Sequence, residues 1–150
     1  MIKCYCDASF SPETKNAICG WKIGEDNAMQ TMLLINTNNT RAEIIGLIHL
    51  IHLVNKLPNN STYIIYTDCL SVIDRIKKRG KLQNKNFCNR KGQSLANADI
   101  YQELFSILKE NIKIIHIDGH LPKNKRNNDN KIFSEIDIAV RRKLRAQSKY

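Results

Sequence analysis

The order of strand-like and helix-like segments constrains the fold more than any other feature of this sequence. Apolar residues alternate with more polar ones over 2–7, and further strand-like segments lie at 17–23 and 29–35. Polar turns at 11–16 and 24–27 separate these segments. Three strands joined by short turns predict an antiparallel meander.

Helices and apolar strands alternate in the rest of the chain. Continuous apolar runs at 63–66 and 112–117 predict buried strands, the first of them central in the sheet. Helical spacing predicts four helices, at 41–56, 69–79, 98–110 and 134–148. The basic segment 77–93 is expected as loop or short helix, and the polar segment 118–131 as flexible. This order predicts an α/β fold, with a mixed five-stranded sheet of three antiparallel and then two parallel strands, flanked by helices.

The composition fits one globular domain spanning residues 1–150. The chain is 42% hydrophobic and 25% charged, which excludes a wholly disordered chain. No run approaches the ~18 apolar residues of a membrane span, and the N-terminus lacks the pattern of a signal peptide. Five cysteines without a CxxC pair indicate neither a disulfide framework nor a zinc site. We therefore expect an intracellular, most simply cytoplasmic, protein with no membrane partner.

The net charge of +10 is concentrated in one segment. Residues 75–98 hold eight basic side chains and no acidic one, whereas residues 1–74 hold five basic and seven acidic side chains. Such a block is typical either of a solvated surface or of a surface that binds a polyanion such as nucleic acid. Composition alone leaves both interpretations open.

Four carboxylates lie at the ends of predicted elements. Asp7 is near the end of the first strand, and Asp68 is at the exit of the fourth. Glu43 and Asp137 are expected in the first turns of two helices. If the first and fourth strands are neighbours, Asp7 and Asp68 meet at one edge of the sheet, where the helix starts add the other two. Four such carboxylates repel one another unless cations neutralise them, and Mg²⁺ prefers oxygen ligands of this kind.

Each of these acids also has a structural interpretation. Segments 40–43 and 134–137 both have the sequence of a capping box, in which the acidic residue bonds back to the start of its helix. Asp68 is a suitable helix N-cap, and Asp7 is able to close an Asx turn. From the residues alone, convergence on one sheet edge is the only argument for a metal site.

Six short motifs, in order over residues 2–145, resemble those of type 1 ribonuclease H. Asn39 to Glu43 reads N-T-R-A-E and matches N-x-R-A-E, and Gly119-His120 matches G-H. The other four are Asp7-Ala8-Ser9 (D-G-S in the family), Tyr66-Thr67-Asp68 (Y-T-D), Asn97 to Tyr101 (N-x-D-L-W) and Asp137-Ile138-Ala139 (D-x-A). The chain departs from the pattern at Cys69, where serine is usual, at Phe133, where asparagine is frequent, and in a longer segment 120–137.

The resemblance implies a ribonuclease H-like fold and an endoribonuclease that hydrolyses the RNA strand of RNA/DNA hybrids, leaving 5′-phosphate and 3′-hydroxyl ends. It implies two Mg²⁺ ions per site, with Mn²⁺ as a possible substitute. Asp7 would bridge both ions, Glu43 and Asp68 would hold the first, and Asp137 the second. His120 would assist proton transfer or product departure.

The resemblance also implies contacts with an RNA/DNA hybrid duplex. Ser9 and Asn39 would contact the minor groove of the hybrid, and Asn38 and Asn97 a phosphate of the DNA strand. The basic block would grip the backbone electrostatically, through Arg75, Lys78, Arg79, Lys85 and Arg90. We expect a monomer, and a free-standing enzyme rather than a piece of a reverse transcriptase polyprotein.

Two alternatives compete with this interpretation. One is another nuclease of the same superfold, such as a Holliday-junction resolvase or an integrase core, which shares a carboxylate edge. The other is a non-catalytic hybrid-binding module that uses the basic block without turnover. The N-x-R-A-E and G-H motifs favour a ribonuclease H over the first.

Overall fold

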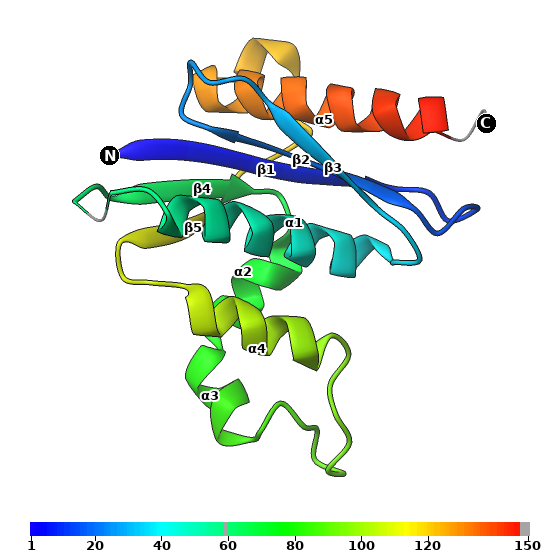
Figure 1. The fold of residues 1–150 in the computed structure, drawn as a ribbon, viewed down its shortest axis with the longest axis vertical. Helices are drawn as coiled ribbons and strands as arrows, with labels where there is room; N and C mark the ends of the chain where they lie inside the picture. The colour runs from blue at the N-terminus through cyan, green and yellow to red at the C-terminus, as the bar shows by residue number, and fades with distance from the viewer. Residues whose placement is uncertain (59, 148–150) are drawn as a thin grey trace.

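The computed structural model describes residues 1–58 and 60–147 (Figure 1). Its strands are β1 (Ile2–Phe10), β2 (Ala17–Ile23), β3 (Gln30–Leu34), β4 (Tyr63–Thr67) and β5 (Ile112–His116). Its helices are α1 (Asn39–Asn55), α2 (Leu70–Lys77), α3 (Arg79–Asn84), α4 (Ala98–Ile107) and α5 (Asn128–Gln147), with a 3₁₀ turn η1 (Lys123–Lys125). No helix in the described part of the chain is long and apolar enough to cross a membrane.

The five strands form one mixed sheet in the order β3-β2-β1-β4-β5. The meander β1-β2-β3 is antiparallel, and β4 and β5 join it in parallel, so the predicted fold class is confirmed. The pairing of β1 with β4 runs from Ile2 opposite Tyr63 to Tyr5 opposite Tyr66 and ends there. Beyond that point β1 continues along β2 alone, so the sheet opens between the ends of β1 and β4.

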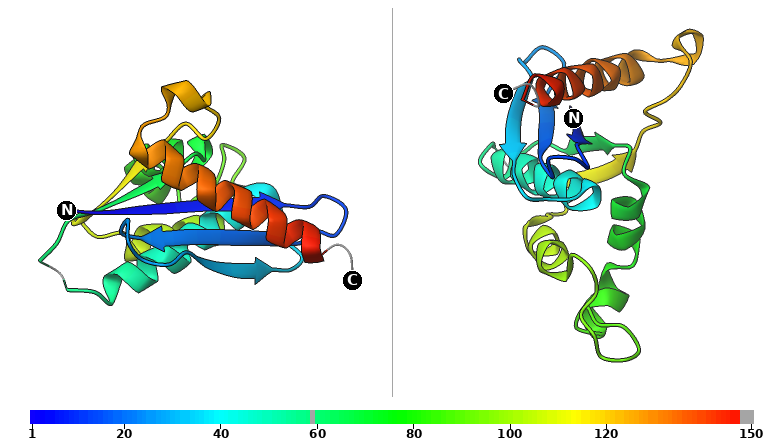
Figure 2. Two further views of the ribbon diagram at one scale, coloured as in Figure 1. Left: turned by 90° about the horizontal axis from the view of Figure 1, so that it is seen from above. Right: turned by 90° about the vertical axis from the view of Figure 1, so that its right-hand side faces the viewer.

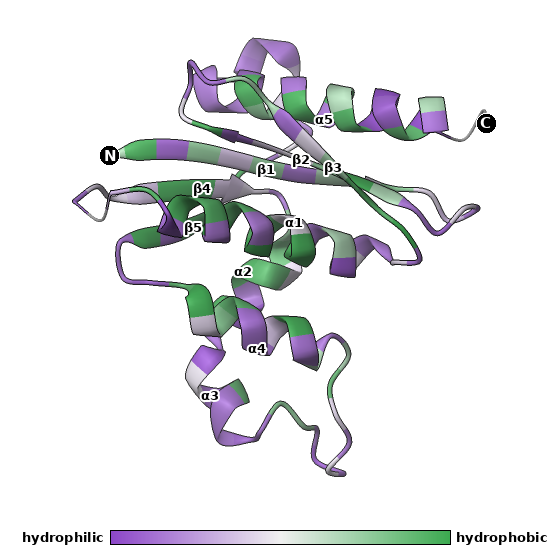
Figure 3. Cartoon of the chain, viewed as in Figure 1, coloured by the Kyte–Doolittle hydropathy of each residue, from purple (hydrophilic) through white to green (hydrophobic). Residues whose placement is uncertain are grey.

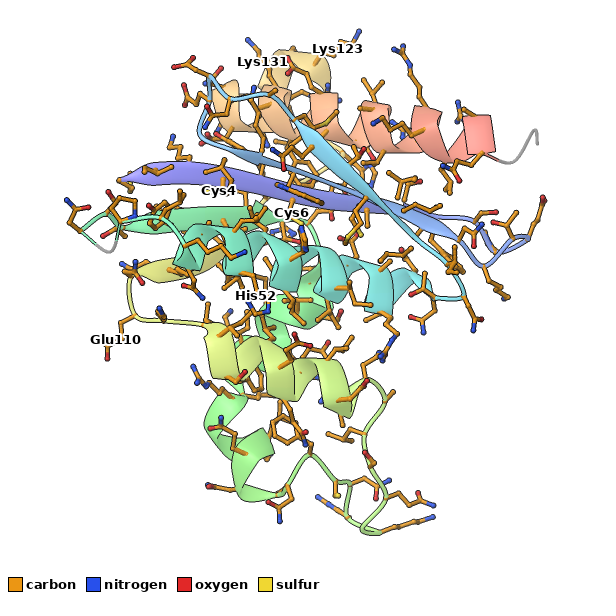
Figure 4. The ribbon with its side chains drawn as sticks, in the orientation of Figure 1. Cys4, Cys6, His52, Glu110, Lys123 and Lys131 are labelled. Carbon is orange, nitrogen blue, oxygen red and sulfur yellow. The ribbon has the colours of Figure 1, made fainter. Side chains whose placement is uncertain are left out.

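Helices cover both faces of the sheet, and each side has its own core (Figures 1 and 2). Helix α1 packs on β1 and β2, and α4 packs on α1. Cys4 and Cys6 face this side of β1 (Figure 4), where they join the larger core. Helix α5 covers β1 and β2 on the opposite side, where Tyr5 and Phe133 belong to the second core. All five cysteines are free thiols, three of them buried.

The basic block forms a protrusion below the sheet. Helices α2 and α3 and the segment after them extend away from the two packed layers, and the tip around α3 is mostly hydrophilic (Figures 1 and 3). Phe87 turns back into the fold with a positive φ and packs on Phe105 of α4, with ring centroids 5.9 Å apart. The tip therefore presents a mainly hydrophilic, basic surface.

Helix α5 begins earlier than the sequence predicts. It starts at Asn128 rather than at 134, because Asn127 and Asn130 cap each other's backbone N–H groups. Within the segment 118–131, expected to be flexible, residues 123–125 form the η1 turn and residues 128–131 already belong to α5. Asp137 lies in the third turn of α5, so the predicted first-turn position and the capping box at 134–137 are wrong.

Three smaller expectations are also corrected. The N-cap of α1 is Asn38, whose Oδ1 accepts a hydrogen bond from the backbone N of Arg41 at 2.9 Å. The capping box predicted at 40–43 is therefore wrong, and Glu43 lies just past the first turn.

Cys69, not Asp68, is the N-cap of α2. Strand β5 is not a fully buried strand, because it lies at the sheet edge and exposes Ile115 and His116.

A buried polar contact holds the start of α5 on the sheet. The hydroxyl of Tyr5, which is fully buried, donates to Asp129 Oδ1 at 2.6 Å, and Lys3 Nζ lies 3.2 Å from Asp129 Oδ2. The ring of Tyr5 stacks on Tyr66 of β4 with centroids 5.5 Å apart. These contacts tie together three elements that are far apart in the sequence.

We expect Tyr5→Phe to lower the free energy of unfolding by about 1–2 kcal/mol, because it removes one charge-assisted hydrogen bond from a buried position. Urea denaturation of the metal-free protein measures this loss. Asp129→Asn in the Tyr5→Phe background should cost less than in the wild type, because the two residues act through one contact. Strictly additive losses would show that the contact does not anchor α5.

Candidate active site

Three carboxylates from different elements meet where the sheet opens. Asp7 of β1, Glu43 of α1 and Asp68, just after β4, place carboxylate oxygens within 4.8 Å of one another. Asp7 is buried and the other two are partly buried. The geometry follows from the sheet register, because the β1–β4 pairing ends two residues before Asp7 and two before Asp68.

Crowding and burial hold these carboxyl groups toward their protonated forms. Burial raises the pKa of Asp7, and the charges of Glu43, Asp68 and Asp137 raise it further. Burial and the charge of Asp68 likewise raise the pKa of Glu43. The pKa of Asp68 is also raised, mainly by burial, and His120 and His116 partly oppose this shift. The cluster therefore lacks positive charge, and a cation would favour the ionised form of each group.

Asp137 lies beside this cluster rather than within it. Its charge contributes to the raised pKa of Asp7, Glu43 and Asp68, so Asp137 lies close to all three carboxyl groups. Its Oδ2 is bound by Arg141 one turn later in α5, with the guanidinium nitrogen 2.7 Å away. The structure thus brings together Asp7, Glu43 and Asp68, and sets Asp137 next to them paired with an arginine.

The residues present fit a divalent metal ion. Glu43 Oε2 is buried and has no hydrogen-bond partner among the described residues. A buried carboxylate oxygen without a partner is costly, and a bound cation would remove that cost. The donors are all carboxylate oxygens, which suit hard ions such as Mg²⁺ or Mn²⁺ better than zinc.

The loop after β5 closes over Asp68 at Gly119. A Cβ added at Gly119 would lie 2.7 Å from Asp68 Oδ2 and 3.3 Å from Phe133 Cε1, so any larger residue would have to displace the Asp68 carboxylate. His120 follows directly, exposed, with its backbone N bonded to Asp118 Oδ1 at 3.0 Å. The G-H motif is therefore explained by space at Gly119 and by the position of His120 near Asp68. Sequence reasoning did not identify Gly119 or Arg141 as parts of the site.

The asparagines predicted to bind substrate lie at the starts of α1 and α4. Asn97 precedes α4 in a left-handed conformation, and its Oδ1 lies 3.4 Å from a guanidinium nitrogen of Arg41. Arg41 is fixed by a second contact with Asp99 at 2.6 Å. Asn38 uses its Oδ1 as the α1 cap, and Asn39 is the first residue of that helix.

The predicted basic residues occupy the protrusion. Arg75, Lys78, Lys85 and Arg90 line a cavity of about 290 Å³ beside α3. Arg79 is the exception, because its guanidinium donates to the backbone carbonyl of Phe105 at 2.6 Å and lies over that ring. Arg79 therefore holds α3 against α4. Of the other four, Lys78 pairs with Asp74 at 3.2 Å and Arg75 lies over the ring of Tyr101 at 5.9 Å.

Comparison with known proteins identifies the family. The family model described as RNase H matches residues 1–134. The chain belongs to the RNase H family. It is thus a ribonuclease H, a hydrolase that acts on RNA/DNA hybrids. The matched range ends three residues before Asp137, in the helix that departs most from expectation. A search of curated protein sequences found no match.

Solved structures share the RNase H fold at low sequence identity. The solution structure of the PFV RNase H domain is 21% identical with a TM-score of 0.72, over 94% of this chain and 91% of that one. The native protease–reverse transcriptase of prototype foamy virus is 20% identical with a TM-score of 0.74, over 94% of this chain and 20% of that one. A foamy viral protease–reverse transcriptase in complex with an RNA/DNA hybrid is 15% identical with a TM-score of 0.61, over 90% and 19%.

We expect Gly119→Ala to weaken divalent-metal binding by about tenfold while leaving the fold intact, because the added methyl group displaces the Asp68 carboxylate. The measurement is the rise in melting temperature as Mn²⁺ is titrated. Gly80→Ala is the matched control, since a Cβ at Gly80 meets no atom within 4 Å. Equal metal responses of the two variants would contradict the role of Gly119.

We expect Asp7→Asn to stabilise the metal-free protein at neutral pH by about 2 kcal/mol. The pKa of Asp7 is raised in the folded protein, so the folded state binds this proton more tightly than the unfolded chain. The stability it contributes is present at low pH and is lost as pH rises above the ordinary carboxyl pKa of ~4. Urea denaturation with chelator, at acidic and at neutral pH, measures the difference.

The matched control for this effect is Asp26→Asn, which changes an exposed acid in a turn. It should leave the pH dependence of stability unchanged. An Asp7→Asn protein that is less stable than the wild type at both pH values would show that the carboxylates do not repel one another.

Proposed function

We propose that this chain hydrolyses the RNA strand of RNA/DNA hybrids with two divalent metal ions, leaving 5′-phosphate and 3′-hydroxyl ends. The observation that carries the proposal is the convergence of Asp7, Glu43 and Asp68 around a buried, unpartnered oxygen of Glu43. Membership of the RNase H family supports the hybrid as substrate. The hybrid-bound foamy viral enzyme supports it as well, because a domain of that protein shares this fold.

The four acids divide between the two ions by position. The pKa of Asp7 is raised by burial and by the charges of all three other carboxylates. Asp7 would therefore contact both ions, and Glu43 and Asp68 would hold the first. Asp137, set beside the triad on α5, would hold the second. When bound, the ions would activate the attacking water and neutralise charge on the phosphate and the leaving oxygen. The water oxygen bonds to phosphorus, and the bond from phosphorus to the ribose 3′-oxygen breaks.

His120 is the residue placed to move a proton. Its loop is fixed at Gly119, and its ring is exposed at the mouth of the site, near enough to affect the pKa of Asp68. The 3′-oxygen needs a proton as it leaves, and the attacking water must lose one. Imidazole is the side chain most often used for such proton transfers in enzymes.

Substrate contacts would come from both sides of the carboxylates. Ser9, two residues after Asp7 on β1, and Asn39 at the start of α1 flank the cluster and would meet the minor groove. Asn38 and Asn97, at the starts of α1 and α4, would hold a phosphate of the DNA strand. The basic residues of the protrusion would grip the backbone further away. The protein would act as a monomer.

A substrate panel tests this proposal. We expect end-labelled RNA/DNA hybrid to be cut in its RNA strand with Mg²⁺ or Mn²⁺ and to stay intact with chelator, because cleavage requires the metal. Double-stranded DNA and a four-way junction should remain uncut. Asp68→Asn should fold normally and lose activity by about 10²-fold or more, because one charged metal ligand is gone.

The matched control is Asp74→Asn, which changes an exposed acid of α2 that pairs with Lys78. It should cut the hybrid at the wild-type rate. Cutting of the junction would indicate a resolvase, and binding of the hybrid without cutting would indicate a binding module. Near-normal turnover by Asp68→Asn would overturn the metal-ligand assignment.

A further inference from the structure

A further pocket is lined by residues of the end of β1, of the turn that follows it and of the C-terminal half of α5. In the ribbon, that turn and the C-terminal end of α5 lie on the same side of the molecule (Figure 1). The volume of the pocket is about 390 Å³, within the range of small-ligand sites. Its polar lining consists of Ser9, Ser11, Glu13, Arg141 and Arg145, and its walls are apolar. We call it the turn–helix pocket.

The turn–helix pocket adjoins the candidate active site through two residues. Ser9 follows Asp7 by two positions in β1, so both side chains lie on the face that α5 covers. Arg141 lines the pocket and also binds Asp137 Oδ2 at 2.7 Å. One guanidinium is therefore shared between the pocket and a carboxylate of the site.

The lining chemistry favours a phosphate group. Arg141 and Arg145 stand one turn apart on α5, and within residues 1–58 and 60–147 Arg145 forms no ion pair. Guanidinium groups bind phosphate oxygens through paired N–H donors, and serine hydroxyls add neutral donors. Glu13 is the one acid in the lining, and two arginines outweigh it.

We propose that the turn–helix pocket binds a backbone phosphate of the RNA/DNA hybrid next to the cleaved bond, through Arg141 and Arg145. Arg141 then exchanges Asp137 for this phosphate, which frees the Asp137 carboxylate for a metal ion. Substrate binding and completion of the metal site are thus coupled through one side chain. This inference rests on the proposed function, because the hybrid supplies the phosphate.

Hybrid binding with chelator present tests the pocket without cleavage or metal bridging. We expect Arg145→Gln and Arg141→Gln each to weaken binding by about tenfold and to lower the slope of log affinity against log salt by about 1. Arg142→Gln is the matched control, because Arg142 is an exposed arginine of the same helix that does not line the pocket. It should bind as the wild type does. Free inorganic phosphate should compete weakly with the hybrid for the wild type.

Metal affinity of the free protein tests the shared arginine. Arg141→Gln should bind Mn²⁺ about two- to fivefold more tightly than the wild type, because Asp137 loses its competing partner. Arg145→Gln, which leaves that partner in place, should bind Mn²⁺ unchanged. Calorimetry without nucleic acid gives both values.

Failure of the proposed function and failure of the turn–helix pocket give different experimental results. A wild type that neither binds nor cuts the hybrid would overturn the proposed function. A wild type that binds the hybrid, with Arg141→Gln and Arg145→Gln no weaker than Arg142→Gln, would overturn the pocket alone. Unchanged or weaker Mn²⁺ binding by Arg141→Gln would overturn the exchange of partners.

Discussion

The structure depends on holding carboxylates together at the place where β1 and β4 part. Asp7 is buried there with Glu43 and Asp68 close by. Burial raises the pKa of each of the three carboxyl groups, and the charges of neighbouring carboxylates raise it further. A fold gains nothing in stability from such a cluster, because burying like charges costs free energy that apolar side chains would not. The surrounding sheet and the two cores must offset that cost. A cluster of this kind is retained for its chemistry, and the chemistry proposed for this chain is metal binding.

Helix α5 positions the fourth carboxylate from outside the sheet. At its start, Asp129 is held by Tyr5 and Lys3, and in its middle Phe133 and Val140 pack into the second core. Asp137 lies on the same continuous helix as these anchored residues, so their packing fixes its position beside the cluster. The same rigidity sets the turn–helix pocket, because Arg141 and Arg145 continue along the helix from Asp137. One element therefore supplies both the fourth carboxylate of the proposed metal site and a candidate phosphate contact.

The strands, their order and the converging acids could be predicted because they depend on local pattern and on short motifs. Alternation at 2–7 and the apolar run at 63–66 each reflect the face that a residue presents to a core. The start of α5 was missed for two reasons. The reciprocal capping of Asn127 and Asn130 is local but uses a pair of asparagines rather than the usual capping-box residues. The contact of Asp129 with Tyr5 joins residues 124 positions apart, which no local pattern shows. The exposure of β5 was missed for a similar reason, since its position at the sheet edge is a property of the whole topology.

The physical reason for the glycine of the G-H motif is visible only in the three-dimensional structure. In the sequence Gly119 is one half of a G-H pair, while in the structure its backbone passes between Asp68 and Phe133 with no room for a Cβ. Phe133 stands where asparagine is frequent in the family, and it is almost fully buried as part of the floor under this loop. Because Phe133 packs beneath the loop and Gly119 has no side chain, the loop backbone contacts Asp68 closely. This contact places His120, the next residue, near Asp68. Packing beneath the loop thus fixes the position of His120, the residue proposed to move a proton, close to Asp68.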